Sequence, residues 1–276
     1  MCNINTLYMP ELPEVETTKI GLEKLLTKQK ITKVEILNSN LRWIVDESIK
    51  SEILNQTIKS FSRRGKYILF NLDKGHLMIH LGMSGKINVV DIDLPLDKHD
   101  HFLLHFNNET MRFNDPRRFG SIFYLESLDH KLLNSLGVEP LEDSFHENYL
   151  FKNSRNKTQN VKAFIMDSKI IVGVGNIYAC ESLYKAGINP KTRANKISKQ
   201  RYINLTNNIK DVLRKAIKAG GTTLQDFAKV DGKPGYFSQE LLVYGRENDN
   251  CYNCNGKITR IVQNQRSTFY CPKCQK

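Results

Sequence analysis

Four cysteines near the C-terminus have the spacing of a metal site. Cys251 and Cys254 form one CxxC pair, Cys271 and Cys274 form a second, and sixteen residues separate the pairs. Two such pairs are typical of zinc sites, because each lies on a tight turn that can direct two thiolates at one ion. Disulfides are the alternative, but the opening MCNINTLY lacks the features of an export signal. We therefore expect one Zn²⁺ held by all four thiolates, and because such a site is closed, the metal is structural.

The rest of the composition predicts a cytoplasmic protein. No run approaches about 18 consecutive apolar residues, which is the length of a membrane-spanning helix. The hydrophobic fraction of 40% and the charged fraction of 25% are ordinary for a globular protein. Cys2 and Cys180 stand alone, and we interpret them as a terminal thiol and a small buried side chain.

The chain carries an excess of positive charge. Its 41 Lys and Arg residues against 29 Asp and Glu residues give a net charge of +12, which favours a polyanionic partner such as nucleic acid or an acidic membrane surface. Basic residues gather in Lys152–Lys169, Lys196–Lys218 and Cys251–Lys276. A single basic cluster is often a solvated face, but three of them, one on the expected zinc module, favour nucleic acid.

These groups must be positioned by two kinds of element. Between about Pro10 and Leu125, short apolar runs punctuated by glycine and proline predict strands, and apolar residues at helical spacing after Pro10 predict a leading helix. The runs are ITKVEIL (31–37), KYILFNL (66–72), HLMIHLG (76–82), KINVV (86–90), HFLLHF (101–106) and SIFYL (121–125). From about Leu128 to Ala219 the pattern becomes helical, with Gly187 and Gly220 as predicted helix stops.

Several longer motifs follow one another along the chain. They are MPELPEVETT, SRRGKYILF, HLGMSG, NDPRRFG, IIVGVGNIYACESLYKAGINP, GGTTLQDF, DGKPGYFSQELLVYGR and QRSTFYCPKCQ. In this order, from Met9 to the C-terminus, the chain closely resembles the bacterial formamidopyrimidine-DNA glycosylases. The resemblance implies an α+β fold with an antiparallel β-sandwich domain over 10–139, a helix–two-turn–helix domain over 140–249 and a zinc finger over 250–276. Residues 1–9 would be an N-terminal extension.

The resemblance also implies an activity and a partner. The family removes oxidised purines, notably 8-oxoguanine and formamidopyrimidines, from double-stranded DNA in base-excision repair. It then nicks the strand as an AP lyase, by β,δ-elimination. We accordingly expect a monomer that binds damaged duplex at the nucleoid and does not bind membranes.

Four residues match the catalytic positions of the family. Pro10 matches the N-terminal proline whose secondary amine forms a Schiff base with the sugar. Glu11 matches the acid that protonates the sugar ring oxygen. Lys66 matches the proton donor in β-elimination, and Arg266 matches the arginine used in δ-elimination. Glu14 also falls in the motif, but a favourable charge at a helix N-terminus explains it equally well.

A second group matches the DNA-contacting positions. Met83, Arg117 and Phe119 match a triad that fills the gap left when the damaged base is extruded from the duplex. Without the resemblance, Met83 and Phe119 would be as readily explained by core packing. The positions expected to contact the DNA backbone are Arg118, Asn176, His99 and Lys157. The DGKPGYF segment, around Lys233–Phe237, matches a loop that closes over the lesion.

One feature departs from the family pattern. The nucleophile must be the first residue of the chain, but MCNINTLYM precedes Pro10. An internal proline nitrogen is an amide without a basic lone pair, so the chain as written should be inactive. We favour a start of translation at Met9, followed by removal of the methionine. The alternatives are cleavage of a real extension or a non-catalytic protein.

Two rival functions remain open from the sequence. The endonuclease VIII branch prefers oxidised pyrimidines, but PELPE and KPGYF resemble the purine branch. A zinc-dependent protein that binds lesions without cutting DNA is the non-enzymatic alternative.

Overall fold

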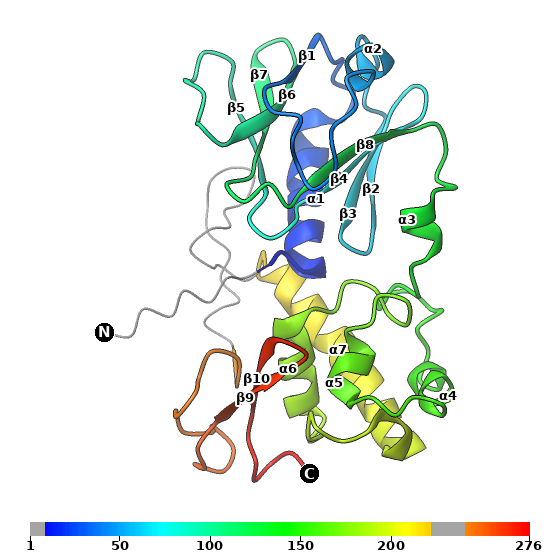
Figure 1. Ribbon diagram of the computed structural model, residues 1–276, viewed down its shortest axis with the longest axis vertical. Coiled ribbons are helices and arrows are strands. Elements are labelled where there is room, and N and C mark those ends of the chain that lie inside the picture. Colours follow the sequence, from blue (N-terminus) through cyan, green and yellow to red (C-terminus); the bar gives the residue numbers. More distant parts are fainter. Residues whose placement is uncertain (1–8, 222–240) are drawn as a thin grey trace. The chain divides into compact units, whose positions relative to one another are not determined.

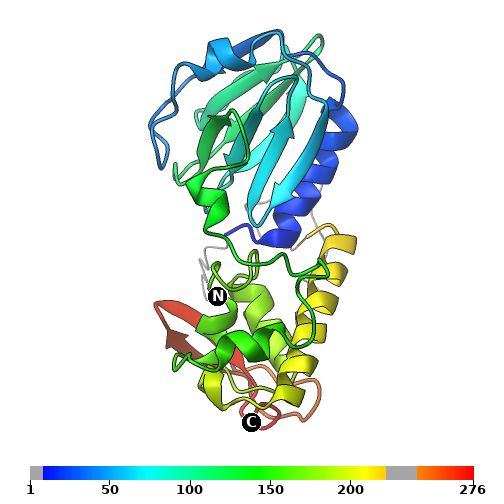
Figure 2. The same ribbon diagram turned by 90° about the vertical axis from the view of Figure 1, so that its right-hand side faces the viewer.

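The computed structural model describes residues 9–221 and 241–276, and the chain divides into two compact units (Figures 1 and 2). The described part of the first unit comprises residues 9–134 together with Gly220 and Gly221. The second unit comprises 135–219 and the described residues from 241 to the C-terminus. Each unit is built from its own elements and is described separately.

The first unit is an antiparallel β-sandwich preceded by a helix. One sheet has the strand order β1-β6-β7-β5 and the other has the order β2-β3-β4-β8. The strands are β1 (Lys33–Ile36), β2 (Ser60–Arg64), β3 (Tyr67–Asn71), β4 (His76–His80), β5 (Lys86–Asp91), β6 (Asp100–His105), β7 (Glu109–Asn114) and β8 (Ser121–Leu125). The helices are α1 (Leu12–Leu26), α2 (Ile49–Ile53) and α3 (Lys131–Asn134).

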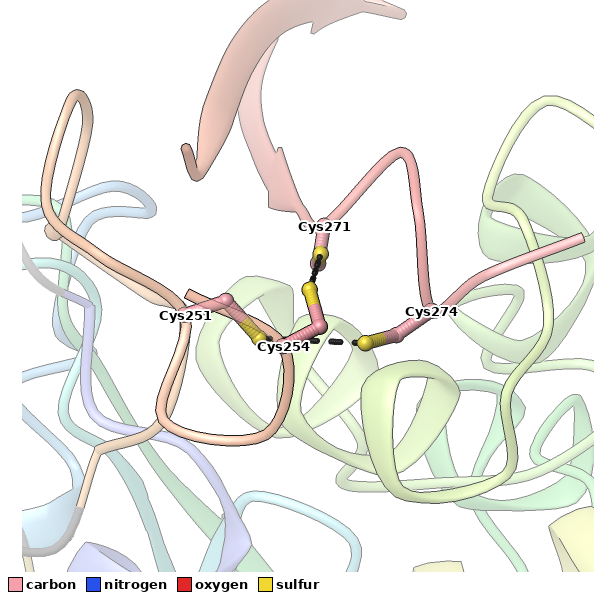
Figure 3. A group of neighbouring side chains, drawn as sticks. All are labelled: Cys251, Cys254, Cys271 and Cys274. Atoms are coloured by element: carbon pink, nitrogen blue, oxygen red, sulfur yellow. Dashed lines mark hydrogen bonds between the residues drawn. The ribbon is translucent and has the colours of Figure 1, made fainter. Parts of the chain in front are cut away.

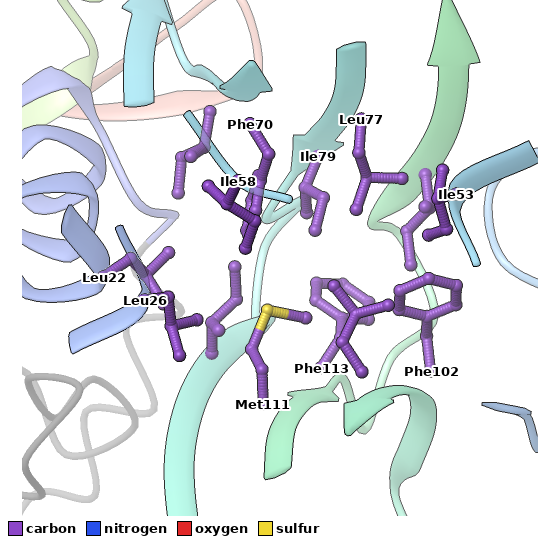
Figure 4. Close-up of a cluster of buried hydrophobic side chains, with 14 of the residues drawn as sticks. Leu22, Leu26, Ile53, Ile58, Phe70, Leu77, Ile79, Phe102, Met111 and Phe113 are labelled. Atoms are coloured by element: carbon purple, nitrogen blue, oxygen red, sulfur yellow. The ribbon is translucent and has the colours of Figure 1, made fainter. Parts of the chain in front are cut away.

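Apolar side chains from both sheets and from α1 form one core (Figure 4). Leu22 and Leu26 of α1, Phe70 of β3 and Phe113 of β7 are fully buried in it. Their burial is the main stabilising contribution, at about 1.5–3 kcal/mol for each large apolar side chain. Helix α1 packs against β2 and β3, so the core fixes where the start of this helix lies within the unit.

The second unit combines helices with a C-terminal hairpin. The helices are α4 (Tyr149–Ser154), α5 (Val161–Ile165), α6 (Asn176–Lys185), the short 3₁₀ helix η1 (Ala194–Lys196) and α7 (Lys199–Lys218). Helices α6 and α7 pack together, and each ends shortly before one of the glycines predicted to stop it. Strands β9 (Thr259–Gln263) and β10 (Arg266–Tyr270) form the hairpin, and β10 packs against α6.

The predicted α+β architecture is confirmed in its main parts: the sandwich with its leading helix, the helical region and the zinc-finger hairpin. Strands β2 and β7 were not predicted. Within the described residues, no helix is both long enough and apolar enough to cross a membrane.

Candidate active site and zinc centre

The four predicted metal ligands lie together at the base of the C-terminal hairpin (Figure 3). Their Sγ atoms are all within 4.8 Å of one another. The Cys251 and Cys274 sulfurs are 3.8 Å apart, and those of Cys254 and Cys271 are 3.5 Å apart. Tetrahedral coordination at a Zn–S distance of about 2.3 Å separates neighbouring sulfurs by about 3.8 Å. The donor set and its dimensions therefore fit one structural Zn²⁺.

The protonation of the thiols also favours a cation at the centre of the cluster. Burial raises the pKa of the Cys251 thiol, but hydrogen bonds from the Tyr184 hydroxyl, 3.1 Å away, and from backbone N–H groups outweigh it and lower this pKa to about 6. Burial raises the pKa of Cys271 to about 12. Four neighbouring thiols cannot all ionise without a compensating positive charge, which zinc supplies.

Removal of this zinc gives the first testable prediction. A strong chelator should abolish DNA binding and leave the sandwich folded, because the metal organises the C-terminal hairpin that carries Arg266 and a structural zinc contributes on the order of 10 kcal/mol. The chain has a single tryptophan, Trp43, which lies in the first unit and reports on the sandwich by its fluorescence.

The measurement is duplex affinity beside Trp43 emission, before and after chelation, with re-addition of zinc as the control. Metal analysis of freshly purified, reduced protein should give one zinc per chain. Protein that contains no zinc, or that binds DNA unchanged after chelation, would contradict the prediction.

The start of α1 carries two buried carboxylates directly after Pro10. The exposed fractions are 2% for Glu11 and 3% for Glu14. The two residues form a capping box: Oε2 of Glu14 accepts the backbone N–H of Glu11 at 3.0 Å, and the Glu11 side chain accepts the backbone N–H of Glu14. This arrangement fixes Pro10 and the Glu11 carboxylate at the start of a rigid helix.

Lys66 lies in the two-residue turn between β2 and β3. Gly65 occupies the preceding position with φ 57°, a conformation that the tight turn requires and that glycine adopts without strain. Arg63 braces this hairpin against α1, because its Nε donates to Oε2 of Glu16 at 2.6 Å and its guanidinium also donates to the Gly65 carbonyl. Lys66, the predicted proton donor, is therefore held on the β2–β3 hairpin, which packs against α1, the helix that directly follows Pro10 and Glu11.

His80 lies close to Lys66 and is neutral at physiological pH. Burial lowers the pKa of His80 to about 4, and the charges of Lys66 and Arg42 act in the same direction. Nδ1 accordingly accepts a hydrogen bond from the backbone N–H of Gly82 at 3.0 Å. The neutral ring thus fixes the beginning of the turn that carries Met83.

The predicted gap-filling residues lie on two loops that touch each other. Met83 is in the turn after β4, and Arg117 and Phe119 are in the loop between β7 and β8. A Cβ atom on Gly82 would lie 2.4 Å from the Phe119 carbonyl carbon, so only glycine permits this close approach. The Arg117 guanidinium lies over the Phe119 ring, 4.9 Å from its centroid, and 41% of Phe119 is exposed. The structure therefore brings the three residues to one region of the sandwich.

Two predicted backbone-contacting residues belong to the same region. Arg118 is exposed, and its backbone N–H donates to the Asp115 carbonyl at 3.1 Å. His99 precedes β6, and its carbonyl accepts the Asp115 N–H at 3.0 Å. Both segments are thus attached to Asp115.

The second unit holds Asn176 and Arg266. Asn176 begins α6, and its Nδ2 donates to the Ser267 carbonyl at 2.9 Å. Arg266 is exposed at the start of β10, directly before Ser267. Nζ of Lys162 donates to the same carbonyl at 3.1 Å and to the Thr268 hydroxyl at 2.6 Å. The start of the helix and the tip of the hairpin are therefore joined.

Two further predicted positions stand apart from these groups. Lys157 is exposed in the loop between α4 and α5. The predicted lesion-closing loop around Lys233–Phe237 lies outside the described residues.

Three known domain families match most of this chain. Residues 9–122 match the family described as "Formamidopyrimidine-DNA glycosylase N-terminal domain" and residues 136–228 match its H2TH domain. Residues 250–276 match the "Zinc finger found in FPG and IleRS". The chain belongs to the formamidopyrimidine-DNA glycosylase family.

Individual relatives agree with this assignment. The formamidopyrimidine-DNA glycosylase of Ruthia magnifica is 60% identical over 268 residues, covering 97% of this chain and 100% of the relative. That of Haemophilus influenzae strain 86-028NP is 49% identical over 270 residues, covering 97% and 99%. A Lactococcus lactis FPG mutant in complex with Fapy-dG containing DNA superposes with a TM-score of 0.91 at 33% identity, covering 97% of this chain and 100% of that one. The Lactococcus lactis Fpg complex with DNA containing an abasic site also has a TM-score of 0.91, at 34% identity, covering 96% and 99%.

Sequence reasoning missed several buried or half-buried polar residues that support the sites of this formamidopyrimidine-DNA glycosylase. Asp115 joins the two loops that carry the predicted gap-filling residues. Tyr184 contacts a zinc ligand, and Glu181 accepts hydrogen bonds from the backbone N–H groups of Leu242, Val243 and Tyr244. Lys162 lies in a basic cluster, yet it is 2% exposed and bonded internally. Lys162 and Glu181 could have been recognised in the sequence, because each is a charged residue on an otherwise apolar face of a helix.

Proposed function

We propose that this protein excises oxidised purines from duplex DNA and nicks the strand, with Pro10 as the nucleophile. The observation that carries the proposal is the position of Pro10 immediately before the buried Glu11, which caps the N-terminus of α1. A secondary amine attacks C1′ of the damaged nucleotide, and the base leaves as an iminium link forms to the sugar. Glu11 protonates the ring oxygen as the sugar opens.

The later steps use two cations. Lys66 acts as proton donor in β-elimination, and the brace between Arg63 and Glu16 holds its turn in place. Burial raises the pKa of Glu16, but the hydrogen bond and charge of Arg63 outweigh it and hold this pKa below its usual value, so the brace stays charged. Arg266 serves δ-elimination and grips the phosphate beside the lesion.

The mature chain then begins at Pro10. An α-amino group has a pKa of about 7.7–8.0, whereas that of a lysine side chain is about 10.4. A larger fraction of a terminal amine is therefore neutral, and able to act as a nucleophile, at physiological pH. The match to the N-terminal domain of the family starts at residue 9, which supports this proposal. N-terminal sequencing of the purified protein tests it.

The excision proposal has a direct test. The protein should release the base from an 8-oxoguanine duplex and cut the strand, and it should act poorly on a matched duplex with an oxidised pyrimidine. The reverse preference would favour the endonuclease VIII type of activity. Binding to damaged duplex without cleavage, by protein that begins at Pro10, would favour the non-catalytic reading.

Base extrusion is assigned to Met83, Arg117 and Phe119. Extrusion costs a few kcal/mol of stacking and pairing, and apolar wedges offset this cost by filling the gap. Among the described residues, Nη1 of Arg117 is buried without a hydrogen-bond partner. Because an unsatisfied buried donor is unfavourable, this guanidinium is suited to an acceptor on the base opposite the lesion.

Backbone contacts are assigned to Arg118, His99, Asn176 and Lys157. The net charge of +12 supports binding to a polyanion, and affinity should fall steeply with salt because each neutralised phosphate releases counterions. We place this activity in the cytoplasm, at the nucleoid. We also propose the domain limits 10–139, 140–249 and 250–276. Family matches over 9–122, 136–228 and 250–276 support this order of three domains.

Replacement of the two adjacent arginines should separate affinity from discrimination. Arg118→Ala should weaken binding to damaged and undamaged duplex alike and reduce the salt slope by about 1. Arg117→Ala should instead reduce discrimination of the base opposite the lesion. Binding titrations against duplexes with cytosine or adenine opposite 8-oxoguanine, at several salt concentrations, measure both the affinity and the discrimination of the opposite base. Identical losses in the two variants would contradict the assignment.

A further inference from the structure

Asp115 is a fully buried carboxylate between two loops at the end of the sandwich. It follows β7 directly and is 0% exposed, whereas its neighbours Pro116 and Arg118 are exposed. A buried carboxylate is tolerated when hydrogen bonds replace the water that it loses. The hydrogen-bond donors around Asp115 therefore identify the segments that this carboxylate connects.

The carboxylate joins the two loops that carry the gap-filling side chains. Oδ1 accepts the Ser84 hydroxyl at 2.5 Å and the backbone N–H of Arg117 at 3.3 Å. Oδ2 accepts the backbone N–H of Gly120 at 2.8 Å. Ser84 directly follows Met83, while Arg117 and Gly120 bracket Phe119. The Arg117 N–H also donates to the Ser84 hydroxyl oxygen at 3.2 Å, so the Asp115 carboxylate and the Ser84 hydroxyl together set the position of one loop relative to the other.

The backbone of Asp115 extends this network to a third segment. Its N–H donates to the His99 carbonyl at 3.0 Å, and its carbonyl accepts the N–H of Arg118 and a hydrogen bond from Nε2 of His101 at 2.9 Å. Asp115 therefore holds two residues proposed to contact the DNA backbone, His99 and Arg118, as well as the loops whose side chains are proposed to enter the duplex.

We propose that Asp115 is a positioning residue for base extrusion, which holds Met83, Arg117 and Phe119 as one preformed unit. This inference rests on the gap-filling role proposed above. The carboxylate has acceptor atoms only, and the Ser84 hydroxyl and the backbone N–H groups of Arg117 and Gly120 all donate to it. An asparagine would turn an N–H₂ group toward the backbone N–H of either Arg117 or Gly120, and neither group can accept a hydrogen bond. The loops would then separate without loss of any side chain that enters the DNA.

The test is Asp115→Asn, which retains the size of the side chain. Single-turnover excision from an 8-oxoguanine duplex should fall about 100-fold, since a displacement of about 1 Å in a positioned group has effects of this size. Cleavage of a duplex that already contains an abasic site should change only a few-fold, because no stacked base has to be extruded. A loss of general fold would lower both activities together.

Asp100→Asn is the matched control. Asp100 is also a buried carboxylate, 6% exposed. It accepts hydrogen bonds from the Asp97 N–H and from Asn114 and pairs with Arg112, and none of these belongs to the gap-filling loops. It should lower the melting temperature without separating the two activities. If Asp115→Asn lowers excision and abasic-site cleavage in parallel, as Asp100→Asn would through stability alone, the inference is overturned.

Two further variants complete the test. Ser84→Ala keeps the carboxylate and both of its N–H partners. It removes the hydrogen bond from the Ser84 hydroxyl to Asp115 and the one that this hydroxyl accepts from the Arg117 N–H, so it should show a smaller loss of the same kind. If Asp115→Asn does not fold, Ser84→Ala takes its place, and unchanged excision by Ser84→Ala would then overturn the inference.

Arg117→Ala reports on the proposed function. If Arg117→Ala is defective and Asp115→Asn excises the base normally, the positioning role alone is refuted. Normal excision and normal opposite-base discrimination in Arg117→Ala would refute the gap-filling role itself.

Discussion

Protein that begins at Pro10 should become covalently attached to an 8-oxoguanine duplex in the presence of borohydride, and protein that retains residues 1–9 should not. Borohydride reduces the iminium formed between a secondary amine and C1′, which makes the link permanent. In the longer protein the Pro10 nitrogen is an amide and cannot form this species. The expected difference is therefore complete, and a denaturing gel of the two forms, each verified by intact mass, measures it.

Pro10→Gly in the short form is the control for this experiment. It keeps a terminal amine, now primary, so it should trap to a lower extent because its geometry at the start of α1 is less constrained. If the intact long form traps as well as the short form, Pro10 is not the nucleophile. Lys66 would then be the first candidate.

Replacement of Glu11 by Gln should reduce base excision by about 10²–10⁴-fold while damaged DNA remains bound, since general acid catalysis contributes effects of this size. The structure makes this substitution informative, because Glu11 also caps α1. The amide oxygen of Gln can still accept the backbone N–H of Glu14, so the helix start should survive the loss of the acid. Single-turnover excision and binding titrations on one duplex measure the two effects.

Glu23→Gln is the matched control for Glu11→Gln. It makes the same chemical change on the exposed part of α1, where the Glu23 side chain is 44% exposed. This variant should excise normally. Equal activity of Glu11→Gln and the unmodified short form would remove Glu11 from the mechanism.

Local sequence patterns predicted those parts of the fold whose side chains are apolar and periodic. The leading helix and the runs that became β3, β4 and β8 are examples, because their burial is visible as continuous or alternating apolar residues. Strand β2 was missed because SFSRR contains one buried apolar residue, Phe61. Strand β7 was missed because it buries polar groups, including Arg112.

The partners of Arg112 explain why no local pattern could reveal β7. Its guanidinium donates to the carbonyls of Leu94 and Pro95, which lie far from it in the sequence, and its side chain pairs with Asp100. Burial of this arginine is thus acceptable only in the folded sheet.

The candidate sites show the same division. The zinc ligands could be predicted from spacing alone, since two CxxC turns already determine most of the geometry. The catalytic and DNA-contacting residues required the family resemblance, because an isolated proline, lysine or methionine carries no such signal. The residues that support them, such as Asp115 and Ser84, are 31 positions apart and meet only through the tertiary fold.

The attachment of the gap-filling loops through backbone groups has a consequence for protein engineering. Asp115 binds main-chain N–H groups and the Ser84 hydroxyl, and none of these belongs to the side chains at positions 83, 117 and 119. The shape of the loops is therefore largely independent of which side chains they display. A combinatorial library at these three positions, on an unaltered Asp115 and Ser84, offers a route to enzymes with new preferences for the opposite base on the same scaffold.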